Sequence, residues 1–293
     1  MKENSDELKY ALISQNIDKK KIKSFQRQIG DASSMKISKR LGTAILFLIF
    51  FGIMMYGIGI GMPEGFESAK SNDIHVISIY VAQAVAEIGQ YVSFLVKLSI
   101  FVWIILAIIF VWPKKNTLRQ LFSGEIFVLW FDICALISGA PLLFGMTLGA
   151  FGRVSFIVQI LVAVYLIYSN IAKLIGEIKI EVYNTPRLRV RGGSTVLIVV
   201  MAGLILLNQY IFKLGNPLDQ KNLFSLLYGW GILYWALFAI FFSTITFKQL
   251  YYSWYLVKYD ERFYKDLNFT DEEWYGKRKA KKIQRTEAKK KSK

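Results

Sequence analysis

Six long stretches of this sequence are almost free of charged residues, and they limit the possible folds more than any other feature. A helix needs about 20 apolar residues to cross the roughly 30 Å hydrocarbon core of a membrane. Lipid offers no partner for free backbone groups, so each stretch is predicted to be helical. The stretches lie at 41–62, 92–112, 125–147, 154–173, 194–213 and 223–247. The predicted fold class is an all-α membrane protein with six transmembrane helices.

Lysine and arginine are distributed unequally between the segments that connect these stretches. With six crossings, 32 of the 37 basic residues fall on one side of the membrane and four on the other, while Lys97 lies inside a stretch. Basic residues favour the cytoplasmic side. The sequence therefore predicts a multi-pass protein of the cytoplasmic membrane with both termini in the cytoplasm.

This topology divides the chain into three parts. Residues 1–40 form a basic N-terminal segment, which is too polar to be a secretory signal peptide. Residues 41–247 form the bundle, with an outer amphipathic helix at 74–91 that could continue into the second span. Residues 248–293 form an aromatic and then polybasic tail. Apolar residues at Ile22, Phe25 and Ile29 predict a helix that lies on the inner leaflet or is solvated.

The segment 178–191 has a different period from the rest of the chain. Apolar and polar residues alternate in IKIEVY and in RLRVR, and NTP supplies a turn between them. This pattern predicts a small cytoplasmic β-hairpin. Its basic residues, Arg187, Arg189 and Arg191, are candidates for binding lipid phosphates or an acidic partner. The alternative is a solvated face that fixes orientation.

The C-terminal tail combines a helix start with dense positive charge. The spacing of Thr270 and Glu273 predicts a capping box, and ten basic residues follow between Lys277 and Lys293. Near an anionic leaflet each would contribute about 1 kcal/mol. The candidate contacts to the lipids of the anionic inner leaflet or to an acidic protein are Lys277, Arg278, Lys279, Lys281 and Lys282. Nucleic acid is not the expected partner, and an orientation signal alone is the alternative.

Ionisable residues inside the predicted spans are few, and they usually face the bundle interior. Asp132 and Lys97 are expected to lie about 12 Å apart in depth, too far for a direct pair. Their first interpretation is polar contact between helices. The second is a route for ions, protons or a small solute. Its candidate residues are Gln83, Glu87, Gln90, Lys97, Asp132, Gln159 and Asn208.

Two pairs of glycines have the G-x-x-x-G spacing that permits close helix contact. One pair is Gly57 and Gly61 in the first span, and the other is Gly145 and Gly149 at the end of the third. Pro141 is expected to kink the third span.

The sequence lacks the residues that most enzymes need. It contains one cysteine and one histidine, no protease motif and no phosphate-binding loop. No metal or cofactor is expected. The favoured function is therefore a non-enzymatic accessory or immunity-type component of a bacterial toxin or secretion system, which acts on a protein partner in the membrane. The alternative is a small transporter or channel. A homo-oligomer is compatible with either function.

Overall fold

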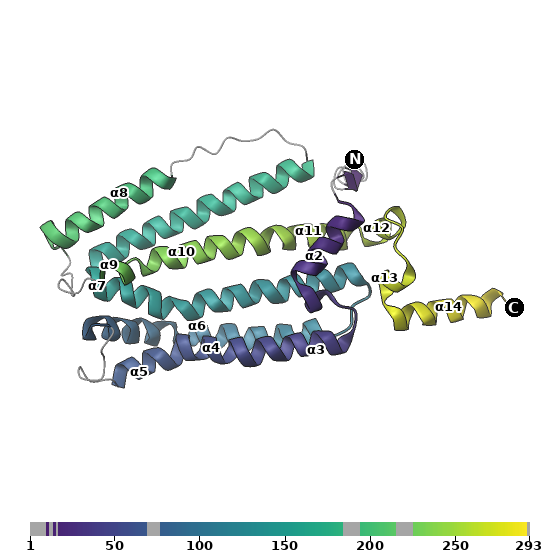
Figure 1. Ribbon diagram of the computed structural model, residues 1–293, viewed down its shortest axis with the longest axis horizontal. Coiled ribbons are helices and arrows are strands. Elements are labelled where there is room, and N and C mark those ends of the chain that lie inside the picture. Colours follow the sequence, from purple (N-terminus) through teal and green to yellow (C-terminus); the bar gives the residue numbers. More distant parts are fainter. Residues whose placement is uncertain are drawn as a thin grey trace.

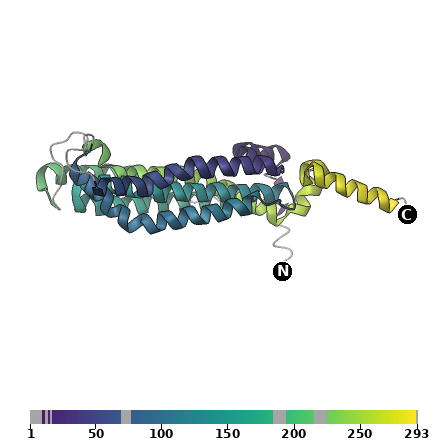
Figure 2. The same cartoon turned by 90° about the horizontal axis from the view of Figure 1, so that it is seen from below.

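The computed structural model describes residues 10–11, 14–15, 17–68, 77–183, 194–214 and 225–291, and these residues are mostly helical and contain no strand. The helices pack into an elongated bundle (Figures 1 and 2). They are α2 (Lys19–Gln28), η1 (Gly30–Ser33), α3 (Ile37–Leu46), η2 (Phe47–Phe51), α4 (Gly52–Tyr56), η3 (Gly57–Gly61), α5 (Met62–Ser68), α6 (Ile79–Val111), α7 (Thr117–Tyr183), α8 (Ser194–Leu207), η5 (Asn208–Phe212), α9 (Ser225–Tyr228), α10 (Gly231–Phe242), η6 (Ser243–Phe247), α11 (Lys248–Lys258), α12 (Asp260–Asp266), α13 (Asp271–Tyr275) and α14 (Lys277–Lys291).

Four helices within the described residues are long and apolar enough to cross a membrane. They are Ile37–Ser68, Ile79–Val111, Thr117–Ile178 and Leu226–Lys258, and a shorter apolar helix covers Val196–Phe212. Two of the four are composite, because π-helical turns join α3 to α5 and α10 to α11 without interrupting the rod. The prediction of an all-α fold with helices long and apolar enough to span a membrane is confirmed for the described residues.

The longest of these helices turns back on itself at Gly152. This residue has φ 75° and ψ 179°, a backbone conformation that only glycine adopts without strain. The residues before and after it form two arms, 117–151 and 153–183, which run side by side in opposite directions (Figure 1). The stretch labelled α7 therefore consists of two helices joined at Gly152, and it contributes two rods to the bundle.

Close contact between α6 and α7 depends on two of the glycines that the sequence singled out. A Cβ atom at Gly145 would lie 2.5 Å from the Cα of Val85, and one at Gly149 would lie 2.5 Å from the Cα of Val81. Real Cβ atoms do not approach backbone so closely. The absence of side chains at these two positions therefore sets the spacing of the two helices.

The C-terminal end of α6 is closed by a buried arginine from α3. The guanidinium of Arg40 donates to the carbonyl oxygen of Val111 (3.1 Å from Nη2) and to that of Ser34 (2.8 Å from Nη1). A cation at this position also interacts favourably with the helix dipole. The hydrogen bonds give this fully buried charge its partners and tie the start of α3 to the end of α6.

The predicted β-hairpin at 178–191 is wrong in its first strand, because α7 continues as a helix through Tyr183. Leu174 and Ile178 lie four residues apart and are both buried, which is the spacing of one helix face. The alternating pattern after Ile178 is too short to override that packing. The remainder of the predicted hairpin, 184–191, lies outside the described residues.

The N-terminal and C-terminal segments fold together at one end of the bundle (Figure 1). We call residues 17–33 and 248–276 the terminal module. The apolar stripe of α2 does not face lipid or solvent: Ile22 is fully buried, and Phe25 stacks on Tyr252 with ring centroids 5.8 Å apart. The shared core is made of Tyr10, Ile17, Ile22, Leu118, Leu121, Ile178, Tyr252, Tyr255, Leu256, Tyr259, Phe263, Phe269 and Trp274. The module is therefore built from segments more than 200 residues apart.

Candidate functional site

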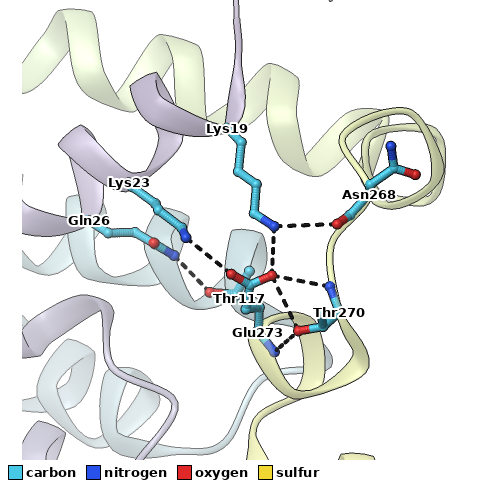
Figure 3. A network of polar contacts seen from close by, with 7 residues as sticks. All are labelled: Lys19, Lys23, Gln26, Thr117, Asn268, Thr270 and Glu273. Carbon is cyan, nitrogen blue, oxygen red and sulfur yellow. Dashed lines mark hydrogen bonds and ion pairs between the residues drawn. The ribbon is translucent and has the colours of Figure 1, made fainter.

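A polar network on the surface of the terminal module joins α2 to α13 (Figure 3). The Nζ of Lys19 lies 2.7 Å from Glu273 Oε2, and the Nζ of Lys23 lies 3.1 Å from Oε1. Lys19 also donates to the backbone oxygen of Asn268 at 3.3 Å. Glu273 completes the predicted capping box with Thr270, which is confirmed. A single carboxylate thus caps α13 and binds two lysines of α2, Lys19 and Lys23.

This network makes the terminal module sensitive to acid. The hydrogen bond from Lys19 is the largest of several effects that lower the pKa of Glu273 from its ordinary value of 4.5 to about 2. A carboxyl group with a lowered pKa stabilises the folded state above its unfolded pKa and loses that contribution as the pH falls toward the folded value. We expect the protection of residues 19–28 against hydrogen exchange, taken relative to the intrinsic exchange rate at each pH, to fall in the full chain in detergent as the pH falls from 4.5 to about 2.

A matched variant separates this effect from general acid unfolding. Glu273→Gln keeps a side chain that suits a capping box but has no charge to titrate. At each pH, the ratio of the wild-type exchange rate to the variant exchange rate reports the contribution of the ionised Glu273 side chain to the stability of α2. The ratio is expected to approach one at the acidic end, and a ratio that does not change with pH would contradict the prediction.

The terminal module is attached to the bundle through the first turn of α7. The buried carboxylate of Asp260 accepts hydrogen bonds from Asn116 Nδ2 at 2.8 Å and from Arg119 Nε at 3.0 Å. Gln26 of α2 donates to the hydroxyl of Thr117 at 2.8 Å (Figure 3). Both halves of the module therefore contact the same short stretch of α7, which fixes their position relative to the bundle.

A groove of about 920 Å³ opens between the two halves of the module. Its lining includes Arg27, Asp31, Lys36, Glu272, Glu273 and Lys277. Several of these charges are paired, since Asp31 binds Lys39 at 2.7 Å and Glu272 lies 3.4 Å from Lys277. The groove is therefore lined by both positive and negative side chains, and it does not have the lining of a site selective for anions or for cations.

The basic helix α14 leaves the module at Gly276. This glycine has φ 78°, and a Cβ atom there would lie 3.1 Å from the Cβ of Met35. In two views α14 extends beyond the end of the bundle, roughly along its length (Figures 1 and 2). Its base is held by Lys279, which donates to the carbonyl of Lys115 at 3.0 Å and lies over the ring of Tyr275.

The predicted lipid-binding or partner-binding residues divide into two groups. Lys277, Arg278, Lys279, Lys281 and Lys282 all lie on α14 and are exposed. Lys277 pairs with Glu272, so part of its charge is used within the module. The other group, Arg187, Arg189 and Arg191, lies outside the described residues. Within the described residues, the exposed face of α14 is therefore the basic surface that remains as a candidate binding site.

The residues of the predicted polar path are not brought together. Gln83, Glu87 and Lys97 are exposed on α6, and Gln90 donates to Glu67 at 3.0 Å. Asp132 is buried on α7 and accepts a hydrogen bond from the Thr246 hydroxyl at 2.5 Å.

The two amides of that path have local roles. Gln159 is fully buried and donates to the carbonyl of Gly229 at 2.9 Å. Asn208 donates to the carbonyl of Leu214 at 3.0 Å and accepts from its backbone nitrogen, so it closes the end of η5. Both side chains satisfy backbone groups near helix ends.

Glu125 is a buried carboxylate that the sequence pattern marks only as the first residue of a predicted span. Its side chain is 1% exposed, and neither carboxylate oxygen has a hydrogen-bond partner. It lies seven residues before Asp132, which places both acids on one face of α7 about 10 Å apart. The seven-residue spacing in the sequence indicates that Glu125 and Asp132 share a helix face, but it does not indicate that Glu125 is buried.

We compared the chain with protein-family models, curated proteins and solved structures, and none of them matches it.

Proposed function

We propose that the chain crosses the cytoplasmic membrane six times with both ends in the cytoplasm. The two arms of α7, the shorter helix Val196–Phe212 and the other three candidate helices would supply the six crossings. Co-folding of α2 with α11 to α13 at one end of the bundle supports this proposal, because an even number of crossings returns the chain to its starting side. The unequal distribution of basic residues supports the cytoplasmic orientation.

The function that this geometry supports best is docking: the protein is a non-enzymatic accessory component that binds an acidic protein through α14. The observation that carries the proposal is that a co-folded module holds the base of this basic helix. A tail that served only as an orientation signal would not need the contact between Lys279 and the loop before α7. Fixing the base of the helix lowers the entropy that a partner must overcome on binding.

The direction of α14 favours a soluble partner over the lipid surface. If the apolar helices are aligned with the membrane normal, α14 points away from the membrane (Figures 1 and 2). Basic residues are attracted to the leaflet only within about a Debye length, roughly 8 Å at physiological salt. Its outer turns would lie beyond that distance. The proposal therefore commits to an acidic protein surface as the partner.

The test places a photo-crosslinking amino acid at Ala288 of the full-length protein in cells. One protein adduct of discrete mass is expected, and neutralising Lys281 and Lys282 to glutamine should reduce its yield several-fold, because steered association depends on local charge. In isolated membranes the same adduct should form only when the cytoplasmic face is exposed to the partner.

A matched charge change provides the control. Lys20→Gln with Lys265→Gln removes the same number of charges from exposed positions of the terminal module and should leave the adduct unchanged. Adducts to lipid or nucleic acid alone, or equal loss in both double variants, would contradict the docking function.

Transport of an ion or small solute is the second candidate, and the burial of Asp132 favours it. The exposed positions of Gln83, Glu87 and Lys97 lie on a different face and do not lead to this carboxylate. A transport route would therefore have to run between α7 and η6, where Asp132 meets Thr246.

A further inference from the structure

Glu125 is the one buried carboxylate of the described residues that has no hydrogen-bond partner at either oxygen. Its side chain is 1% exposed. Asp132, by contrast, accepts a hydrogen bond from Thr246. Leaving an ionised carboxylate buried without a donor or a cation costs several kcal/mol. The site must therefore contain something that removes or balances the charge.

The register between α7 and α11 places Glu125 in an interior contact. Asp132 of α7 meets Thr246, which comes just before α11, and Asn116, which comes just before α7, meets Asp260, just after α11; α7 and α11 therefore run antiparallel. Seven residues before Asp132 on α7 correspond to seven residues after Thr246, at Ser253. Ser253 is buried, but its hydroxyl donates to the carbonyl of Leu250 at 2.9 Å. The nearest polar group on α11 by register therefore uses its proton elsewhere.

The charged groups on the surrounding elements have other contacts. Arg40 binds the carbonyls of Val111 and Ser34, Asp31 binds Lys39, and Arg119 binds Asp260. Lys248 and Lys258 lie at the two ends of α11. On the side of α2 and η1, the neighbours of the adjacent Gly124 are the apolar Ile29 and the backbone of Ala32. The nearest acid along the same face of α7 is Asp132, about 10 Å away, and it has the same sign of charge as an ionised Glu125.

We propose that Glu125 is a proton-binding site between α7 and α11 and that the folded protein holds this side chain as the neutral acid. A proton needs no further ligands, and it removes the buried charge in a place where no cation is provided. Repulsion from the carboxylate of Asp132 also favours the neutral form of Glu125. The proposal does not depend on the docking function of α14, because the two sites share no residue.

Proton binding makes the stability of the full-length protein depend on pH. Near neutral pH the unfolded chain has an ionised Glu125 and the folded chain a neutral one, so unfolding releases a proton. Stability must then fall as the pH rises. One proton corresponds to a fall in the thermal midpoint of about 3 °C per pH unit for a protein of this size. We expect this slope between pH 6 and 8, measured in detergent micelles at constant ionic strength.

The decisive variant is Glu125→Gln, which has the shape of the neutral acid but binds no proton. Its midpoint should lie within about 2 °C of the wild-type value at pH 6, and it should lack the pH dependence. The exposed Glu87→Gln removes a carboxylate from α6 and should retain the wild-type slope. A hydrophobic carbodiimide, which adds to protonated carboxyl groups, should label Glu125 more at pH 6 than at pH 8, as mapped by mass spectrometry.

Three results would overturn the proposal. In the first, Glu125→Gln shows the same pH slope as the wild type. In the second, the variant is strongly destabilised at pH 6, which would mean that the ionised form is the native one. In the third, replacing sodium and potassium with choline at constant ionic strength lowers the wild-type midpoint but not that of the variant. That result would assign the site to a metal cation.

Discussion

Replacing Gly145 with alanine is expected to destabilise the bundle by about 3 kcal/mol, because overpacking a close contact forces neighbouring atoms apart. The new methyl group would lie 2.5 Å from the Cα and Cγ2 of Val85 and 2.6 Å from its backbone nitrogen. A backbone cannot change rotamer to relieve such a clash, so α6 must move as a whole. Thermal unfolding of the full chain in detergent should show a midpoint lower by roughly 6 °C.

The first span provides the control for this prediction. Gly57 and Gly61 have the same spacing as Gly145 and Gly149, but a Cβ atom at either position meets nothing within 4 Å. Alanine is expected to be tolerated there, and its helix propensity could add about 0.5–1 kcal/mol of stability. Equal midpoints for Gly145→Ala and Gly57→Ala would mean that α6 and α7 are not in close contact.

The two glycine pairs show what a sequence motif can predict and what it cannot. The spacing predicts which residues share a helix face. It does not predict whether another helix lies against that face, because that depends on the packing of the whole bundle. Gly145 and Gly149 meet α6, whereas Gly57 and Gly61 meet no neighbour, although both pairs satisfy the same pattern.

Apolar length was the most informative part of the sequence, and local periodicity was the least. Long uncharged stretches predict membrane helices because the hydrocarbon thickness is fixed. The alternation after Ile178 is only a few residues long and fits a helix end as well as a strand. The deciding contact is the burial of Ile178 against the aromatic core of the terminal module. That core could not be inferred from a local window.

The terminal module was missed for the same reason. The stripe of Ile22 and Phe25 predicts a helix on the inner leaflet or in solvent, and the aromatic run 251–259 is rich in Tyr and Trp, which favour the membrane interface. Nothing in one sequence indicates that they are partners of each other, because Tyr10 and Asp266, which share a hydrogen bond, are 256 residues apart. The lipid interface explained both surfaces equally well.

Candidate site residues could be listed from the sequence but not oriented. Ionisable residues inside spans are rare enough to be enumerated, and Asp132 was found in this way. Whether a residue faces lipid or the interior depends on the rotation of its helix against its neighbours. Lys97 is exposed on α6 and Asp132 is buried on α7, so the two charges proposed for one path lie on different faces.

Phe263→Ala is expected to have the largest effect on the terminal module, with a loss of about 4 kcal/mol. The Phe263 side chain is fully buried, and its ring meets that of Tyr10 edge-on with centroids 5.2 Å apart. Because both termini share this core, a cavity in α12 should release the N-terminal segment as well. We expect trypsin to cleave between Lys19 and Lys23 faster, by up to about a thousandfold if the module opens and closes rapidly.

This result would distinguish a co-folded module from two independent tails. If residues 17–33 were held only by lipid or by contacts with α7, a substitution at Phe263 would leave their cleavage rate unchanged. Lys265→Ala changes an exposed residue of the same helix and should have no effect. The bundle should remain folded in Phe263→Ala, because the contacts between α6 and α7 do not involve the module. Circular dichroism of the uncleaved variant should therefore retain nearly all of the wild-type helical signal, while the tryptic sites of α2 become accessible.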